Sequence, residues 1–244
     1  MIPPTTPHTF IFLHIEKTAG RSINELLDKH FGKNNVIHIY PGPTGDDLFD
    51  ATLRLCRGVR LIAGHVDFGI HSILSVTGFS YFTFVRNPTG RLISEYFYFK
   101  KRNCELAKNQ WRKKNKIIDE CGSVLDFVLH PNRVRNPLVS RVCGRMFKHE
   151  VTFNQAKSNV IQHFAFVGVI EKMEMSMELM NQVVGEPLGS VPHSNKTRYK
   201  PLDQSERKEI EERMQQTDAI DFKFYAWCYD RLKESPFKCP DLLR

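Results

Sequence analysis

The chain has 244 residues, of which 41% are hydrophobic and 25% charged, and its formal net charge is +8 at pH 7. This length suits one α/β domain with a full hydrophobic core, so the fold needs neither disulfides nor metal ions as staples. The basic balance favours a polyanionic partner, such as a nucleotide, an acidic glycan, nucleic acid or an acidic membrane, and charge alone does not choose among them.

We predict a single domain over residues 1–244. Within it we expect a flexible N-terminus at 1–8, a basic insertion at 100–118 and a long loop at 185–201. No apolar run approaches the roughly 20 residues that span a bilayer, and the first residues lack the basic and apolar regions of a signal peptide. The sequence as given therefore predicts a soluble protein without a targeting segment.

The six cysteines form no CxxC pair and no cluster with histidine, so we expect no metal site. Cys104 and Cys121 are spaced so that a disulfide would close the basic insertion. Scattered free thiols are the simpler interpretation, because a chain of this size does not need the bridge.

The first predicted strand and helix are joined by a turn rich in groups that bind anions. Residues 10–15 are a continuous β-prone run, and hydrophobic residues recur at helical spacing over 23–31. A helix N-terminus offers free N–H groups and the positive end of the helix dipole, to which a lysine adds charge and hydroxyls add donors. The spacing is not that of a nucleoside-triphosphate P-loop, and similar turns also occur without a ligand. The candidate anion-binding residues are Lys17, Thr18, Ala19, Gly20, Arg21 and Ser22.

A strand at 36–40, a helix at 46–57 and a strand at 59–63 follow. This β-α-β-α-β order predicts a mainly parallel sheet that binds ligands at the carboxyl ends of its strands. His65 comes directly after the third strand, so we expect it on the same rim as Lys17. A histidine there can act as a general base near neutral pH, although a half-buried histidine with one backbone hydrogen bond is the alternative.

The next strand, at 81–85, ends at Arg86. Pro88 begins the following helix, where its missing N–H costs nothing, and Ser94 lies two turns along. A guanidinium binds phosphate through two parallel hydrogen bonds, and a nearby hydroxyl can take a third oxygen. The alternative is that Arg86 pairs with a neighbouring carboxylate.

The segment 100–116 is strongly basic. By default it is a solvated loop or helix face, and the alternative is a guide for an acidic polysaccharide with Trp111 stacking on a sugar. We expect no nucleic-acid partner, because the basic residues are not interleaved with aromatics. Downstream, the pattern predicts helices at 124–130, 136–145 and 153–163, a buried strand at 164–169, a methionine-rich helix that packs into the core, and two final helices at 203–216 and 219–233.

Three motifs, in order, resemble the carbohydrate sulfotransferases that use 3′-phosphoadenosine 5′-phosphosulfate (PAPS), most closely the heparan sulfate and uronyl 2-O-sulfotransferase branch. Residues 14–22 (HIEKTAGRS) resemble the HIPKTAGTS motif, residues 64–68 (GHVDF) resemble GHVSF, and residues 81–94 resemble a strand-RDP-helix element. The resemblance extends from Phe10 to about Lys233. It implies an α/β fold of three layers, with a mainly parallel central sheet flanked by helices and a P-loop-like turn.

The resemblance also implies roles for individual residues. The turn at 17–22 would hold the 5′-phosphosulfate, Arg86 and Ser94 the 3′-phosphate, and His65 would be the catalytic base, with Lys17 stabilising the departing phosphate. Residues 192–200 resemble the HLRKT segment that lies over the adenosine bisphosphate, and Arg141 is a loose match to the acceptor cleft. The loop candidates are Asn195, Lys196 and Thr197.

The implied reaction moves the sulfuryl group of PAPS to a hydroxyl of an acidic, glycosaminoglycan-like polysaccharide, leaving adenosine 3′,5′-bisphosphate and requiring no metal. The family resemblance places such an enzyme in the Golgi lumen if a membrane anchor precedes this chain, and otherwise we expect the cytoplasm. The sequence does not indicate an oligomeric state.

The chain departs from the family pattern at three places. Ala63 stands where these enzymes carry a second functional histidine, and Glu16 replaces a proline, where its carboxylate either weakens anion binding or points to solvent. Cys121 and Cys143 match cysteine positions of the family, but their partners are absent. Two other functions stay open: a non-catalytic binder of nucleotide or sulfated glycan, and a nucleotide kinase or phosphohydrolase, which the turn spacing and the lack of an aspartate for magnesium disfavour.

Overall fold

The computed structural model describes residues 8–40, 58–106, 116–145, 149–189 and 202–234. Within them the strands form one five-stranded sheet in the order β2-β3-β1-β4-β5, and every neighbouring pair is parallel. All strands therefore end at the same edge of the sheet, as the β-α-β pattern predicts. The strands are β1 (Thr9–Leu13), β2 (Val36–Ile39), β3 (Leu61–Gly64), β4 (Phe79–Val85) and β5 (Phe164–Val169).

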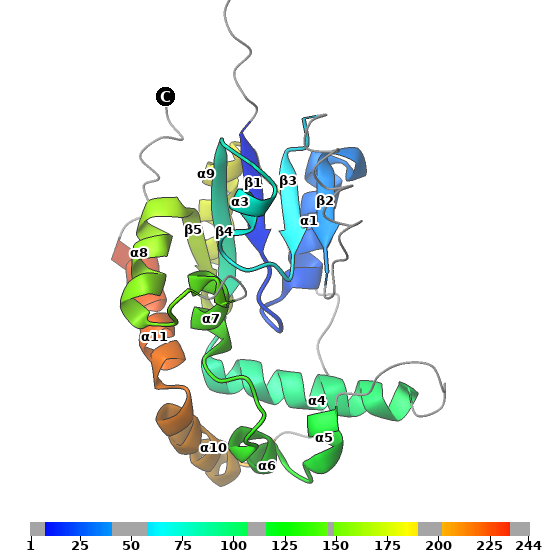
Figure 1. The fold of residues 1–244 in the computed structure, drawn as a ribbon, viewed down its shortest axis with the longest axis vertical. Helices are drawn as coiled ribbons and strands as arrows, with labels where there is room; N and C mark the ends of the chain where they lie inside the picture. Colours follow the sequence, from blue (N-terminus) through cyan, green and yellow to red (C-terminus); the bar gives the residue numbers. More distant parts are fainter. Residues whose placement is uncertain (1–7, 41–57, 107–115, 146–148, 190–201, 235–244) are drawn as a thin grey trace, which may run out of the picture.

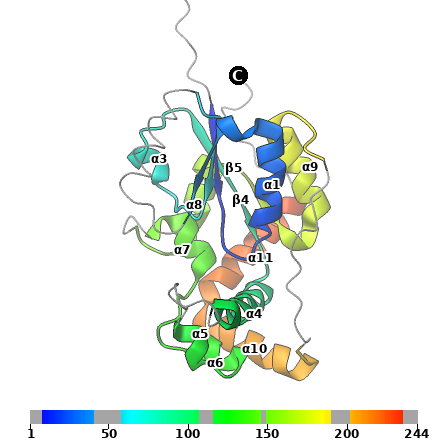
Figure 2. The same cartoon turned by 90° about the vertical axis from the view of Figure 1, so that its right-hand side faces the viewer.

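Helices cover both faces of this sheet, which confirms the three-layer prediction. Figure 2 shows α1 (Gly20–Phe31) and α9 (Met173–Val184) on one side, and α3 (Ile70–Ile73), α7 (Pro137–Cys143) and α8 (Phe153–His163) on the other. Because both faces are covered, the inner strands are buried along nearly their whole length instead of alternating between core and solvent. Every residue of β1 and β5 is buried, and Met177 and Met180 of α9 join the same core, as expected.

A helical layer lies beneath the carboxyl edge of the sheet. Figure 1 shows α4 (Pro88–Leu106) running across the ends of the strands, with α5 (Lys116–Glu120), α6 (Val124–Leu129) and α10 (Gln204–Thr217) below it. A second hydrophobic cluster holds these helices together and includes Leu92, Tyr96, Phe127, Ile210 and Met214. The first part of the predicted basic insertion continues α4 as helix.

Most predicted elements agree with the structure to within two residues. The predicted helix at 46–57 lies outside the described residues. Short 3-10 turns occur at η1 (Lys33–Asn35) and η3 (Ile170–Lys172). The helix starts at α6 and α10 are both capping boxes, made by Ser123 with Asp126 and by Asp203 with Glu206. The last helix, α11 (Ala219–Glu234), follows α10 and packs against β5 and α8 (Figure 1).

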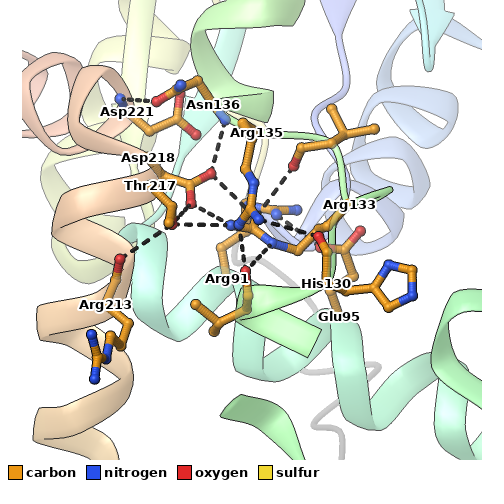
Figure 3. Close-up of polar contacts among 12 residues, drawn as sticks. Arg91, Glu95, His130, Arg133, Arg135, Asn136, Arg213, Thr217, Asp218 and Asp221 are labelled. Carbon is orange, nitrogen blue, oxygen red and sulfur yellow. Dashed lines mark hydrogen bonds and ion pairs between the residues drawn. The ribbon is translucent and has the colours of Figure 1, made fainter. Parts of the chain in front are cut away.

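A buried polar cluster joins the α6–α7 connection to the α10–α11 junction (Figure 3). Arg133 is 6% exposed, and its guanidinium donates to both carboxylate oxygens of Asp218, which is fully buried. The same carboxylate accepts the backbone N–H of Asn136 at 2.8 Å. This cluster fixes the residues that lead into α7.

The first turn of α11 holds the start of α7 in a second way. Asp221 is 1% exposed, and its carboxylate accepts the backbone N–H groups of Leu138 at 3.0 Å and Val139 at 2.9 Å. Burial raises the pKa of Asp221 to about 7, although these two hydrogen bonds oppose the shift. Asp221 thus satisfies N–H groups that a helix start leaves without partners, and it anchors the helix that carries Arg141.

In the described part of the chain, no helix has both the length and the apolar character that crossing a bilayer requires. Nor does that part contain a group of three or more His, Cys, Asp or Glu side chains arranged to hold a metal ion. Cys121, Cys143 and Cys228 are buried free thiols, so Cys121 does not form the disulfide considered above.

Candidate active site

The turn between β1 and α1 has an unusual backbone. Lys17 and Ala19 have φ angles of 69° and 62°, in the left-handed region that residues other than glycine seldom adopt. Each such conformation costs about 1–3 kcal/mol and is typical of ligand-binding turns. The hydroxyl of Thr18, expected to face an anion, donates instead to the carbonyl of Ile15 at 2.8 Å, so it holds the turn together.

Gly20 is the first residue of α1, and its lack of a side chain makes room for His14. A Cβ atom on Gly20 would lie 1.8 Å from Nε2 of His14. His14 is 8% exposed, and burial lowers its pKa to about 3, so it is neutral at physiological pH. In the same first turn of the helix, Arg21 is exposed and Ser22 is buried.

Lys17 reaches from this turn to the middle of α4. Its ammonium lies 3.9 Å from the centre of the Tyr98 ring, a cation–π distance. Burial lowers the pKa of Lys17 to about 8, and among the neighbouring charges Arg86 adds most to this shift. Lys17 is therefore partly desolvated and lies close to other positively charged side chains.

The charges around Lys17 are mostly cations. Arg86 follows β4 and its Nη1 donates to the carbonyl of Lys17 at 3.5 Å. Arg91 is 2% exposed and donates to Glu95 at 2.8 Å. Arg86, Arg91 and Arg21 all lower the pKa of Lys17, whereas Glu95 raises it. Such an excess of positive charge at a helix N-terminus suits a ligand with several negative charges.

Ser94 lies on the same helix as Arg91 and Glu95 and is 6% exposed. Gly90 is one turn before Ser94 on the same face, and a Cβ atom there would lie 3.5 Å from Nε of Arg86. The structure therefore brings Arg86 and Lys17 together where α4 meets the sheet edge, and it buries Ser94 one turn further along α4 than Gly90. The predicted loop residues Asn195, Lys196 and Thr197 lie outside the described residues.

His65 follows β3, on the same edge of the sheet as Lys17. Gly64 permits this position, because a Cβ atom there would lie 1.7 Å from the carbonyl oxygen of Ile39. The His65 ring centre is 4.5 Å from that of His14 and 5.1 Å from that of Tyr40. Burial lowers the pKa of His65, so the imidazole is neutral at pH 7 and able to accept a proton.

The Glu16 carboxylate does not simply point to solvent, because it is bound in an ion-pair network. Its effect on anion binding stays a prediction. Arg141 of α7 donates through Nη2 to Oε1 of Glu16, and through Nη1 to Asp67 at 2.7 Å and to the carbonyl of His65 at 3.1 Å. Burial raises the pKa of Glu16, but Arg141 and His65 outweigh it and the net pKa is lowered. Arg141, predicted to contact the acceptor, thus joins two carboxylates beside His65.

Sequence reasoning missed several residues of this site. Arg91, Glu95 and Tyr98 lie at positions i, i+4 and i+7 of α4, so they share one face of the helix. This spacing is the sequence signal that could have identified them as neighbours of the turn. Asp67 lies in the GHVDF motif and was not assigned a role. Ala63, where the resembling enzymes carry a histidine, is fully buried in the sheet beside Phe12.

Comparison with known proteins assigns the chain to a family. A search of curated proteins finds no match. The model of the "Sulfotransferase family", however, matches residues 5–222, which include all five strands, the turn after β1, α4 and the start of α11. Because the match covers most of the chain, the protein belongs to the sulfotransferase family.

Proposed function

We propose that this protein transfers the sulfuryl group of PAPS to a hydroxyl of an acidic glycan. Membership of the family supports sulfuryl transfer with PAPS as the donor. One observation carries the proposal to particular residues. The cationic turn with Lys17 and the neutral imidazole of His65 follow adjacent parallel strands, so a donor anion and an acceptor hydroxyl can meet at one edge.

The residues of the site fit this donor. The strained turn and the start of α1 offer N–H groups to the 5′-phosphosulfate, and Lys17 adds its charge. Arg86, which donates to the carbonyl of Lys17, and the buried Ser94 of α4 are the proposed partners of the 3′-phosphate. Burial first, and the neighbouring cations second, lower the pKa of Lys17, and the negative charge of a bound bisphosphate would offset the effect of those cations.

In the proposed reaction His65 takes the proton of the acceptor hydroxyl at Nε2. As that O–H bond breaks, the acceptor oxygen bonds to sulfur, and the bond between sulfur and the 5′-phosphate oxygen breaks. The electron pair of this bond stays on the phosphate, which leaves as part of adenosine 3′,5′-bisphosphate. Lys17 and the N–H groups of the turn stabilise the charge that builds there.

An acidic glycan fits the outer end of α4. Lys100, Lys101 and Arg102 follow Tyr98 along this helix, and Arg102 donates to the Tyr98 hydroxyl at 3.0 Å. The basic stretch therefore begins next to the residue that touches Lys17. Together with the net charge of +8, it favours a negatively charged acceptor over a neutral one. The similarity to 2-O-sulfotransferases supports a glycosaminoglycan-like polymer.

The proposal is tested first by ligand-induced thermal stabilisation, because ligands that bind only the folded state raise Tm. Adenosine 3′,5′-bisphosphate should raise Tm, and Arg86→Ala should weaken its affinity about ten- to a hundredfold through loss of a charge-assisted contact. Arg60→Ala is the control, since Arg60 is exposed and precedes β3 at the opposite edge of the sheet. A larger, magnesium-dependent shift with ATP would favour a nucleotide kinase.

Turnover is tested second, with PAPS and a panel of acidic polysaccharides. Sulfated product is expected with the wild type, and His65→Ala should abolish it while keeping the affinity for the bisphosphate. Binding without turnover on any acceptor would instead identify a non-catalytic nucleotide-binding protein.

A further inference from the structure

The Nδ1 atom of His65 is buried and makes no hydrogen bond within the described residues. The carboxylate beside it belongs to Glu16, whose Oε1 lies 3.7 Å away. A buried polar atom without a partner is costly, and a catalytic hydrogen bond is often long until the substrate is bound. Glu16 and His65 are therefore placed as a carboxylate–histidine pair, but at 3.7 Å the hydrogen bond between them is not formed.

Arg141 keeps the two members of this pair together. Its guanidinium binds the Glu16 carboxylate with one nitrogen and the backbone carbonyl of His65 with the other. The net pKa of Glu16 is lowered, so the carboxylate stays ionised at neutral pH. The pairing depends on α7 being in place, and Asp221 and Asp218 hold the start of that helix.

We propose that Glu16 is a positioning residue for His65: its carboxylate accepts a hydrogen bond from the Nδ1–H of the imidazole and so leaves Nε2 with the lone pair that takes the acceptor proton. The inference rests on the proposed role of His65 as the base. Once His65 has taken the proton, the Glu16 charge also stabilises the imidazolium. Glu16 stands where the similar enzymes have proline, so this chain supplies the carboxylate itself.

The other groups that face His65 do not replace Glu16 in this role. His14 is neutral and contacts the ring through packing, and Tyr40 is held by Asn24, which donates to its hydroxyl. Asp67 is bound to Arg141 at 2.7 Å. Arg141 lowers the pKa of His65 and Glu16 raises it, so Glu16 acts on the imidazole in the direction that favours proton uptake.

The test is the tautomer and pKa of His65, measured by ¹⁵N NMR of the ring nitrogens in the whole protein. In the wild type the neutral ring should carry its proton on Nδ1. In Glu16→Ala it should move to Nε2, the tautomer that histidine prefers in water. In Glu16→Gln the amide oxygen can still accept a hydrogen bond from Nδ1–H, but the charge is gone, so the pKa of His65 should fall.

Activity gives a second readout. Both variants should lower kcat about ten- to a hundredfold, as the loss of an orienting partner does, with the Kd for adenosine 3′,5′-bisphosphate unchanged. In Glu16→Gln the acidic limb of the pH–rate profile should move to lower pH. Asp28→Asn is the matched control, because Asp28 pairs with His38 at 2.8 Å on α1 and β2. It should alter the signals of His38 and leave those of His65 unchanged.

An unchanged His65 tautomer in Glu16→Ala, together with an unchanged His65 pKa in Glu16→Gln, would overturn the proposal. If Glu16→Ala fails to fold, Glu16→Gln supplies the pKa and the pH profile. If the protein binds no bisphosphate but Glu16 still sets the tautomer, the donor assignment fails and the Glu16–His65 pair stands.

Discussion

The ammonium of Lys17 lies 3.9 Å from the centre of the Tyr98 ring, so the turn after β1 touches the middle of α4. This contact joins the edge of the sheet to the helical layer below it. It also partly buries Lys17 and brings it near Arg86 and Arg91. Burial first, and the neighbouring cations second, lower the pKa of Lys17 to about 8.

We predict that the affinity for adenosine 3′,5′-bisphosphate falls as pH rises above about 8. In the free protein Lys17 loses its proton near that pH, whereas a bound phosphate favours the charged amine and raises its pKa. Binding above pH 8 therefore takes up a proton and weakens by up to about tenfold per pH unit. Calorimetry between pH 7 and 9.5, in two buffers of different ionisation enthalpy, measures both the Kd and the uptake.

Lys17→Arg is the control for this prediction, because a guanidinium stays charged throughout this range. Its affinity should be independent of pH between 7.5 and 9.5. An equally steep fall in Lys17→Arg would assign the pH dependence to another group.

The sequence could predict that the main candidate site residues lie together at one edge of the sheet, because parallel strands all end at the same edge. Lys17, His65 and Arg86 each follow a predicted strand, and the apolar runs that mark these strands are local signals. The partners of these residues could not be predicted in the same way. Glu16 and Arg141 are 125 residues apart, and their pairing depends on where α7 docks.

The last helix shows the same limit. The apolar pattern of residues 219–233 predicts an inner face with Phe222, Trp227 and Leu232, whereas the structure buries Phe224, Cys228 and Leu232 most deeply and leaves Phe222 and Trp227 partly covered. This helix contacts β5, α4, α7, α8 and α10, so it has no single buried stripe. An apolar period is informative only when one face of a helix is covered.

Gly20→Ala should disturb the site through His14. The added methyl would lie 1.8 Å from Nε2 of His14, and that ring is buried between Phe12 and His65, so it cannot turn away freely. We expect a destabilisation of about 1–3 kcal/mol from overpacking, and weaker binding of the bisphosphate. Urea denaturation and calorimetry measure the two effects.

Gly90→Ala is the matched substitution, since a Cβ atom there meets only an ordinary contact with Arg86 at 3.5 Å. In the first turn of α4 it should leave stability unchanged or raise it by at most about 0.5–1 kcal/mol. A Gly20→Ala protein as stable as the wild type would show that the His14 ring has room to move.

Asp218→Ala should strongly destabilise the fold. It leaves the Arg133 guanidinium buried without its carboxylate and removes the acceptor of the Asn136 N–H, so we expect a loss of about 3–5 kcal/mol in the free energy of unfolding. Lys208→Ala, which breaks an exposed pair with Glu212 at 3.8 Å on α10, should change stability by no more than about 0.5 kcal/mol.

Because the Arg133–Asp218 pair fixes the start of α7, Asp218→Ala should also loosen Arg141 and weaken the hold of Glu16 on His65. Urea denaturation measures the loss of stability, and the His65 tautomer measures the weaker contact with Glu16. A loss below about 1 kcal/mol would mean that water or another acceptor reaches Arg133, and that α7 is held mainly by Asp221.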